Sequence, residues 1–372
     1  MEILMRKNRM LSAAVLLLII CLAAMNGTSH EKKTRAFHSD YGFAVNRQQL
    51  ESTIKKACSR EAADITITEK LLGGATESGL VAAICPHDDY SYAAQVYAHV
   101  IPYVKAKRVI IFGVAHKAKD FNLKDKLIFG SFDEWDTAAG ALQVSGLEEY
   151  LIGHLKSDDY AVSNPFMEQE HSIEALTHWI KYYNPDAEII PICIPHMKWE
   201  RMQELAKSLS AALAGKIKSD GWKASSDYAI LISNDSSHYG DQGWGGKNYA
   251  PFGCGVKGYL EATGRDIRLA GDYLAGQLTI DKLHKLFAAL VDEKDPYTYL
   301  ITWCGRFSIP FGLSVLVNVS ESIGEQPFSG IFLSYGTSVA LGLMDEGIEP
   351  PLQTTAPSNL HHWVGYLAMG FK

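Results

Sequence analysis

The stretch that decides the fold is residues 81–116, which read VAAICPHDDYSYAAQVYAHVIPYVKAKRVIIFGVAH. Apolar runs at 81–85 and 108–113 predict two strands, and the Ala-, Tyr- and Val-rich segment between them predicts a helix over residues 91–105. Two strands joined through a helix lie parallel in one sheet. The stretch therefore predicts a strand–helix–strand unit of an α/β fold, with a histidine shortly after each strand.

The same alternation continues along the chain. Periodicity and apolar runs predict, in order, helix 47–62, helix 170–183, strand 188–194, helix 200–218, strand 228–233, helix 281–292, helix 309–322 and strand 330–334, with a glycine-rich loop over residues 240–258. The strands show little internal alternation of apolar and polar residues, so helices should cover both of their faces. We therefore expect a three-layer α/β/α sandwich with a mostly parallel central sheet.

Both ends of the chain are expected to lie outside this domain. Residues 1–29 combine a basic start with an uncharged apolar run at 11–24, which is typical of a secretory signal peptide. The run is short for a membrane span, which needs about 20 residues, although an uncleaved signal anchor is the alternative. We expect an exported protein, periplasmic or extracellular, with an α/β domain over residues 30–345 and a C-terminal tail over residues 346–372.

Composition narrows the classes of function. The chain is 47% hydrophobic and 21% charged, which is ordinary for a globular protein with a large core. A net charge of -7 argues against a nucleic-acid partner, because phosphate contacts need clusters of Lys and Arg. The cysteines beyond the signal segment are too few and scattered for a disulfide scaffold, and their odd number leaves a thiol free for the core or for a metal. They are Cys58, Cys85, Cys193, Cys254 and Cys304.

Three predicted strands are each followed closely by a histidine. His87 follows 81–85, His116 follows 108–113, and His238 follows 228–233. Ligands in open α/β sheets bind outside the carboxyl ends of the strands, and histidine is both the commonest metal ligand and an acid–base group. Any one of the three could be an unrelated loop histidine, but the set predicts a shared site.

Two further polar residues are candidates for proton transfer. Asp235 lies in SNDSSH, near His238, where it could orient the imidazole or simply bond the backbone of a polar turn. His171 lies in EHSIE at a predicted helix start, either in the pocket or on a solvated face, whereas His178 is expected at the surface. Because no Gly-x-Ser-x-Gly motif is present, the serines beside Asp235 do not predict a nucleophile.

Cysteine supplies two more candidates. Cys304 precedes Gly305 and Arg306, and its thiolate would be a soft ligand suited to iron, copper or zinc, although a single cysteine is most often a small core residue. Arg306 could lower the pKa of that thiol. The sequence GCGVKG at 253–258 matches the spacing G-x-G-x-x-G, but it follows no strand, so a dinucleotide site is not expected. The glycine-rich loop, with Trp244 and Tyr249, should instead edge a pocket.

Six segments in this order resemble the Memo family, also called protein B of the AmmeMemoRadiSam system. The segments are PHDDYSYAAQVYAHV (86–100), IIFGVAHK (110–117), EHSIEALTHW (170–179), ISNDSSHYG (232–240), TWCGRFSIPFGLSVL (302–316) and FLSYGTSVALG (332–342). The resemblance implies a fold like that of class III extradiol dioxygenases, which bind non-haem Fe(II) through two histidines and a carboxylate. Memo-like proteins place two histidines and a cysteine near the equivalent position.

Carried over by motif, the resemblance implies that His87, His116 and Cys304 are the metal ligands. His171, Asp235 and His238 fall on the remaining pocket positions, and we expect them to move protons or, for Asp235, to orient His238. The family commonly has Pro-His-Ala-Gly-Tyr where this chain has Pro-His-Asp-Asp-Tyr, so Asp88 and Asp89 are a departure. A second departure is Gly-Val-Ala-His, residues 113–116, in place of Gly-Pro-Ser-His.

The resemblance also shapes the functional expectation. Family members are linked to iron or copper and to redox chemistry, and one animal member to phosphotyrosine peptides. We expect an exported metalloprotein that holds a divalent transition metal, iron before copper or zinc, and acts as a redox enzyme on a small molecule. The alternatives are a non-catalytic metal- or peptide-binding protein on a dioxygenase-like scaffold, and a zinc-dependent hydrolase.

Overall fold

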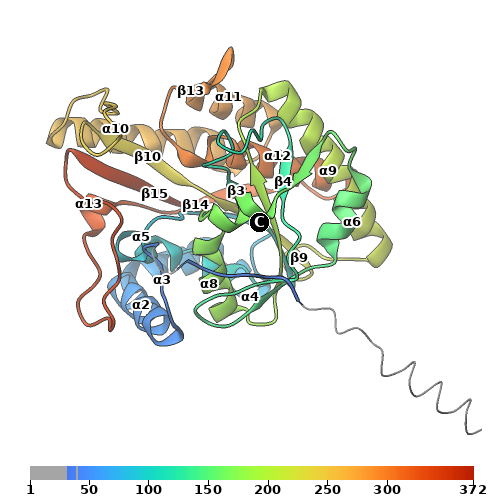
Figure 1. Ribbon diagram of the computed structural model, residues 1–372, viewed down its shortest axis with the longest axis horizontal. Coiled ribbons are helices and arrows are strands. Elements are labelled where there is room, and N and C mark those ends of the chain that lie inside the picture. The colour runs from blue at the N-terminus through green and yellow to red at the C-terminus, as the bar shows by residue number, and fades with distance from the viewer. Residues whose placement is uncertain (1–31, 39–40) are drawn as a thin grey trace, which may run out of the picture. The chain divides into compact units, whose positions relative to one another are not determined.

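The computed structural model describes residues 32–38 and 41–372, and all elements named below belong to the compact unit Thr34–Lys372 (Figure 1). The predicted signal segment, residues 1–29, lies outside the described residues. Among the residues that are described, no helix is both long and apolar enough to cross a membrane.

A large mixed sheet forms the centre of the unit. Its strand order is β1-β5-β6-β8-β3-β9-β2-β15-β14-β11. The bounds are β1 Thr34–Arg35, β5 Glu134–Trp135, β6 Leu142–Val144, β8 Glu188–Ile194, β3 Arg108–Val114, β9 Tyr228–Ser233, β2 Ala82–Cys85, β15 His362–Phe371, β14 Ser329–Thr337 and β11 Gly276–Gln277. From β6 to β2 each neighbouring pair is parallel, whereas β15 and β14 run antiparallel to their neighbours. The predicted α/β fold with a mostly parallel central sheet is confirmed.

Short strands extend this framework. β10 (Asp235–Gly240) pairs with β15, and β4 (Leu127–Phe129) pairs with both β8 and β7 (Tyr160–Val162). A separate hairpin is formed by β12 (Val291–Asp292) and β13 (Asp295–Tyr299). None of these was expected from the sequence, because β4, β7 and β12 have only two or three residues and the longer β10 (DSSHYG) and β13 (DPYTY) are largely polar.

Helices cover the two faces of the sheet. One side carries α2 (Arg47–Arg60), α3 (Ala62–Leu72), α5 (Tyr90–Tyr97) and α8 (Glu174–Tyr183), which lie below the sheet in Figure 1. The other side carries α6 (Leu147–His154), α9 (Trp199–Asp220), α11 (Ile280–Leu290) and α12 (Ser308–Ile323). The remaining helical segments are α4 (Ala75–Ser78), η1 (Ile101–Tyr103), α7 (Asn164–Gln169), α10 (Val256–Leu269), the π-helical turn η2 (Ala270–Leu274), η3 (Cys304–Arg306) and α13 (Ser338–Leu341).

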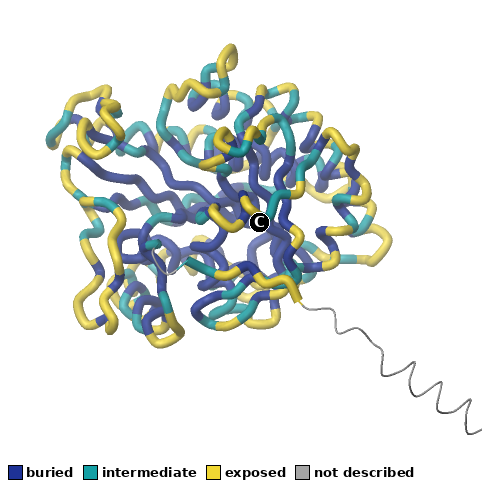
Figure 2. The backbone as a smooth tube through the Cα atoms, in the orientation of Figure 1, coloured by how far each residue is buried: buried dark blue, intermediate teal, exposed yellow. Residues whose placement is uncertain are grey.

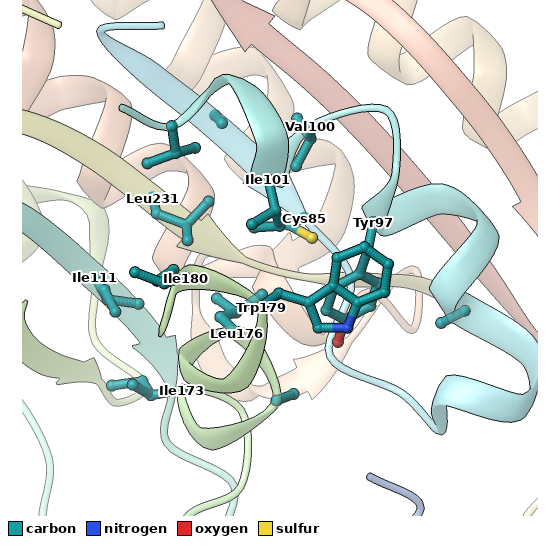
Figure 3. Close-up of a cluster of buried hydrophobic side chains, with 14 of the residues drawn as sticks. Cys85, Tyr97, Val100, Ile101, Ile111, Ile173, Leu176, Trp179, Ile180 and Leu231 are labelled. Carbon is teal, nitrogen blue, oxygen red and sulfur yellow. The ribbon is translucent and has the colours of Figure 1, made fainter. Parts of the chain in front are cut away.

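The parallel strands divide their side chains between two cores. In β3, Val109 and Ile111 face the core under α8, whereas Ile110 and Phe112 face the core under α9 and α12. Successive side chains of a strand point to opposite faces, so a strand buried on both sides must be apolar throughout. Figure 2 shows the central strands buried along their length, and Figure 3 shows Ile111 beside Ile173 and Ile180 of the first core.

Several predicted boundaries change. The helix expected over 91–105 ends at Tyr97 and is followed by η1, which contains Pro102. The helix expected over 170–183 begins only at Glu174, because Glu170 has extended backbone and caps α7. The loop expected over 240–258 ends early, since α10 begins at Val256.

The C-terminal boundary is wrong in a more important way. The segment 346–372, expected as a tail, supplies β15, a fully buried ten-residue strand between β2 and β14. Its sequence HWVGYLAMGF is apolar on both faces, as a strand inside a sheet requires. The domain therefore extends to Lys372 rather than ending at residue 345.

Candidate metal centre

The strands β3, β9 and β2 are consecutive neighbours in the sheet, so the side chains that follow them meet at one edge. A cavity of about 540 Å³ opens there. It is lined by all six predicted site residues, namely His87, His116, His171, Asp235, His238 and Cys304. The structure thus brings all six residues together at one cavity.

His87 is held in one orientation by buried hydroxyl groups. Its Nδ1 lies 2.7 Å from Ser233 Oγ, and the same hydroxyl donates to the carbonyl of Ser172 at 2.7 Å. Because the Ser233 proton is used by that carbonyl, His87 Nδ1–H must donate to Ser233, which leaves a lone pair on Nε2. His87 Nε2 is buried without a hydrogen-bond partner among the described residues, although Asp235 Oδ2 lies 3.3 Å away. This unpartnered nitrogen is suited to hold a metal.

His116 is positioned by a buried carboxylate. Its Nδ1 lies 2.9 Å from Glu170 Oε1, and its backbone N–H donates to Glu170 Oε2 at 2.8 Å. Burial would raise the pKa of Glu170, but the charge and hydrogen bond of His116 outweigh it and hold that pKa below its usual value. A carboxylate behind an imidazole fixes the ring and strengthens its free nitrogen as a ligand. Glu170 was not identified from the sequence as a functional residue.

Cys304 is the third member of the predicted ligand set and lines the same cavity. It begins η3, where Gly305 N–H donates to Asn234 Oδ1 at 2.9 Å. A Cβ on Gly305 would lie 2.5 Å from that oxygen, so glycine is required for this close approach. Burial raises the pKa of the Cys304 thiol, but the charge of His238 and interactions with His116 and His87 lower it well below its usual value. The pocket thus stabilises a thiolate with positive charge, as a bound cation would.

We call His87, His116 and Cys304 the pocket cluster. One potential ligand atom from each lies within 4.8 Å of the others. The rings of His87 and His116 meet edge to face, with centroids 5.2 Å apart. The donors are two imidazoles and one thiolate, a set that suits iron, copper or zinc and not magnesium or calcium. These residues fit a transition metal.

His171 faces the same pocket beside the cluster. Its ring stacks on His116 at 4.5 Å between centroids, and a third of its side chain is exposed. Burial and the neighbouring charge of His116 lower its pKa to about 3. His171 is therefore neutral at physiological pH and able to accept a proton.

His238 and Asp235 are both in the pocket, but Asp235 does not orient His238 as expected. Asp235 Oδ1 accepts the backbone N–H of His87 at 2.9 Å, so it supports the other histidine. His238 Nδ1 lies 3.3 Å from the carbonyl of Thr302, and His238 Nε2 lies 3.8 Å from Cys304 Sγ. Burial lowers the pKa of His238, but the Cys304 thiolate outweighs this effect and raises the pKa to about 9.

The two aspartates that follow His87 have different surroundings. Asp88 Oδ2 accepts from the hydroxyl of Tyr366 at 2.6 Å, on β15. Asp89 accepts from the backbone and hydroxyl of Thr355, and a Cβ on Gly42 would lie 2.0 Å from Asp89 Oδ1. Burial and the charge of Asp88 raise the pKa of Asp89 to about 7. Both aspartates line the pocket, and Asp89 also holds Thr355, in the segment before β15, at the pocket wall.

Aromatic side chains form the outer wall of the pocket. Trp244 stacks on His362 with ring centroids 3.9 Å apart and an interplanar angle of 10°. The expectation that the glycine-rich loop edges a pocket with Trp244 and Tyr249 is confirmed. The other aromatic wall residues are Tyr41, Phe43 and Tyr299.

Three residues outside the pocket cluster differ from what the sequence predicted. Arg306 stacks its guanidinium on Tyr299 at 3.6 Å and donates to the Trp303 carbonyl, so its main contacts are not with the thiol. His178 is fully buried rather than at the surface, where it accepts the Ala138 N–H, and burial lowers its pKa to about 3. Arg35 lies in a segment read as a polar lead-in, yet it is buried, pairs with Glu174 at 2.5 Å and donates to the Glu170 carbonyl.

Fold and site together define a class: an α/β sandwich protein with a histidine–cysteine cluster at the carboxyl ends of its parallel strands. A family model for Memo-like protein matches residues 42–342, and the chain belongs to this family. The matched range begins shortly before α2, includes α13, and ends before β15.

Proteins of similar sequence are themselves named as members of this family. A MEMO1 family protein of Pyrobaculum aerophilum is 28% identical over 207 residues, covering 54% of this chain and 66% of the relative. A second, from Pyrobaculum arsenaticum, is 29% identical over 201 residues, covering 52% and 62%. The matched part therefore spans less than two thirds of these relatives. A solved structure of an uncharacterized Escherichia coli K12 protein aligns with a TM-score of 0.40 and 13% identity, covering 77% of this chain and 99% of that one.

Proposed function

We propose that this Memo-like protein is a metalloprotein in which His87, His116 and Cys304 hold a divalent transition metal, with iron as the expected ion. The observation that supports this most is the pair of fixed imidazoles: each donates Nδ1–H to a buried acceptor and keeps its other nitrogen for the pocket. Such supporting contacts are typical of metal-ligating histidines. Bound there, iron would supply one-electron redox chemistry.

The remaining pocket residues would handle protons. The pKa of His238 is raised to about 9 by the Cys304 thiolate, so it carries a proton at neutral pH. The pKa of His171 is lowered to about 3 by burial and by His116, so it is unprotonated. Environments that separate the pKa values of two groups assign an acid and a base. We therefore infer that His238 donates a proton to the substrate and His171 accepts one.

The shape of the pocket favours a small substrate. A cavity of about 540 Å³ lies in the usual range for small-molecule sites, and aromatic rings line its outer wall. The edges and faces of Trp244, Tyr249 and Tyr299 would hold a planar or aromatic ring and exclude water from the polar floor. A redox enzyme that acts on a small aromatic compound is thus the function that the pocket supports best.

An exported location is also part of the proposal, and it rests on the composition of residues 1–29 alone. N-terminal sequencing of the native protein from its own cell, after fractionation, tests it. Cleavage near residue 29 is the expected result, and a retained Met1 in the cytoplasmic fraction would contradict it.

The metal assignment can be tested by element analysis. The protein is purified anaerobically without a histidine tag, and bound metals are measured in the wild type, His87→Ala and Cys304→Ser. His284→Ala and Cys58→Ser are matched controls, because both residues lie away from the pocket. We expect metal to fall in the first two variants and to stay at the wild-type level in the controls. Unchanged metal in both pocket variants would overturn the assignment.

Metal identity and oxygen consumption then separate the functional alternatives. Iron together with substrate-dependent oxygen uptake supports the redox enzyme. Zinc alone, with hydrolysis of a test ester, would support the hydrolase instead. Bound metal without turnover of any small molecule would support the non-catalytic binding protein.

A further inference from the structure

A second group of potential metal ligands lies outside the pocket. Asp241, Cys254 and His361 each offer one ligand atom, and the three atoms lie within 4.8 Å of one another. His361 Nδ1 pairs with Asp241 Oδ1 at 2.8 Å. The residues come from three segments: the end of β10, the end of the glycine-rich loop, and the residue before β15. We call them the outer cluster.

The backbone around Cys254 is shaped to place this side chain. Gly253 has φ 78° and Gly255 has φ 112°, conformations that L side chains rarely adopt. A Cβ at either glycine would meet nothing within 4 Å, so conformation rather than space requires glycine there. The G-x-G spacing that fails as a dinucleotide motif thus has a different role, which is to turn Cys254 toward Asp241.

The other two residues are fixed to each other through the backbone. The N–H groups of Asp241 and Gln242 both donate to the His361 carbonyl, at 3.1 and 3.2 Å. The His361 N–H donates to Asn359 Oδ1 at 2.8 Å. Two of the three potential ligands are therefore held close together by contacts that do not involve their own side chains.

We propose that the outer cluster binds a zinc-class divalent cation. A thiolate, an imidazole and a carboxylate are all ligands that Zn²⁺ takes in proteins, and three of them leave a fourth position for water. On binding, the Cys254 thiol releases its proton to solvent and a Zn–S bond forms, with no change of oxidation state. Asp241 contributes a second negative charge, and His361 binds in its neutral form.

The position of the outer cluster indicates what the ion would do. Asp241 and Cys254 lie near the two ends of the loop that carries Trp244 and Tyr249, and His361 directly precedes β15. A cation held by all three would close this loop at its base and tie it to β15. Since Trp244 stacks on His362 in the pocket wall, the ion would hold the aromatic wall in place. The outer site would thus be structural, and it is independent of any metal at the pocket cluster.

Cobalt titration tests the proposal without interference from the pocket. In the full-length Cys304→Ser variant the pocket thiol is absent, so a thiolate-to-Co²⁺ charge-transfer absorption must arise from another cysteine. We expect one equivalent of Co²⁺ to produce this band, and Zn²⁺ to displace it. The band should disappear in Cys304→Ser/Cys254→Ser and persist in Cys304→Ser/Cys58→Ser, the matched control.

Two further variants, one of the carboxylate and one of the imidazole, complete this test. Asp241→Asn and His361→Gln, each in the Cys304→Ser background, should weaken Co²⁺ binding at least tenfold, as loss of a ligand or its charge does. Absence of the band, a band that survives Cys254→Ser, or affinities unchanged by both variants would overturn the proposal. Saturation only at large metal excess would indicate an adventitious ion only, and would also overturn it.

Limited proteolysis tests the proposed role of the ion in the loop. Lys247 is exposed in the middle of the loop, and Lys294 is exposed in a separate turn, between β12 and β13. With free Zn²⁺ at ten times its dissociation constant, opening of the loop should be suppressed about tenfold. Tryptic cleavage after Lys247 should slow accordingly, whereas cleavage after Lys294 should not change. Equal rates at Lys247 with Zn²⁺ and with chelator would refute the loop-closing role.

Discussion

The pocket cluster and the outer cluster use the same kinds of residue but differ in what supports each ligand. His87 and His116 are backed by buried acceptors, and the side chains of this pair are 1% and 28% exposed. His361 and Asp241 support each other, with side chains 49% and 40% exposed. The two histidines of the first cluster follow parallel strands of the central sheet, whereas the residues of the second cluster lie in loops next to β10, α10 and β15. The comparison shows that a site is made rigid before metal binds by buried hydrogen-bond partners behind its ligands, rather than by the type of ligand residue.

The largest expected effect concerns the support behind the pocket cluster. Arg35→Met leaves Glu174 buried without its ion-pair partner and removes the donor to the Glu170 carbonyl. Breaking a buried pair from one side costs about 3–5 kcal/mol of unfolding free energy. Urea unfolding measures the loss, and Arg47→Met, which removes an exposed pair with Glu51, is the control. If both variants lost the same free energy of unfolding, the buried Arg35–Glu174 pair would contribute no more to stability than an exposed pair.

The next effect is on metal affinity at the pocket cluster. Glu170→Gln keeps the shape of the side chain but removes the charge behind His116, so we expect metal affinity to fall about 10–100-fold. Competition with a chelator of known affinity measures this change. Glu61→Gln is a matched control, because Glu61 pairs with His99 at 3.1 Å away from the pocket. An affinity that responds equally to both variants would mean that Glu170 does not position His116.

The two thiols should also differ in their pH dependence. Burial raises and the pocket histidines lower the pKa of Cys304, with a net result well below 9.0, whereas burial and Asp241 raise the pKa of Cys254 above 9.0. Since the thiolate is the reactive form, metal-free Cys304 should be alkylated by iodoacetamide at neutral pH, and Cys254 only at higher pH. Mass spectrometry of peptides at each pH measures both rates. If the alkylation rates of Cys304 and Cys254 changed with pH in the same way, the predicted difference between their pKa values would be wrong.

The smallest expected effect concerns the outer cluster without metal. Asp241→Asn removes an exposed ion pair with His361, and exposed pairs contribute little because water screens them. In chelator the midpoint of thermal unfolding should therefore match the wild type. In Zn²⁺, and with Cys304→Ser removing the pocket thiol, the protein that keeps Asp241 should gain more stability than the Asp241→Asn variant, because a ligand that binds the native state alone stabilises it. A large loss in chelator would show that the outer cluster is rigid without an ion.

Patterns along the chain were enough to predict the centre of this fold. Strands β3, β8 and β9 are long, apolar and buried on both faces, so they appear in the sequence as nearly continuous apolar runs. The meeting of His87, His116 and His238 was expected from the rule that ligands gather at the carboxyl ends of parallel strands. The order of the strands in the sheet was not predicted, because it is set by pairing between distant segments. Cys304 was found through family resemblance, because nothing in its local pattern separates a ligand from a core thiol.

What could not be predicted depends on contacts between distant segments. Glu170 reads as part of an amphipathic helix, and only its position against His116 gives it a role. Arg35 stands in a polar stretch whose burial is decided by β1 pairing with β5. Asp235 lies three residues before His238 in sequence, yet the backbone of β2 brings His87 to it instead. No local signal identified Glu170, because it directly precedes His171 but supports His116, which lies 54 residues earlier in the sequence.

The position of β15 has a consequence for how the protein is made. Met369 pairs with Ile84, so β15, which comes late in the sequence, is the neighbour of β2, which comes early in it. Until β15 has been synthesised, β2 has an open edge and the pocket lacks the wall formed by His362 and Val364. The nascent chain therefore cannot complete its central sheet until these ten residues have emerged. Deleting β15 alone would remove little mass, yet it would leave β2 and β14 without the strand that joins them.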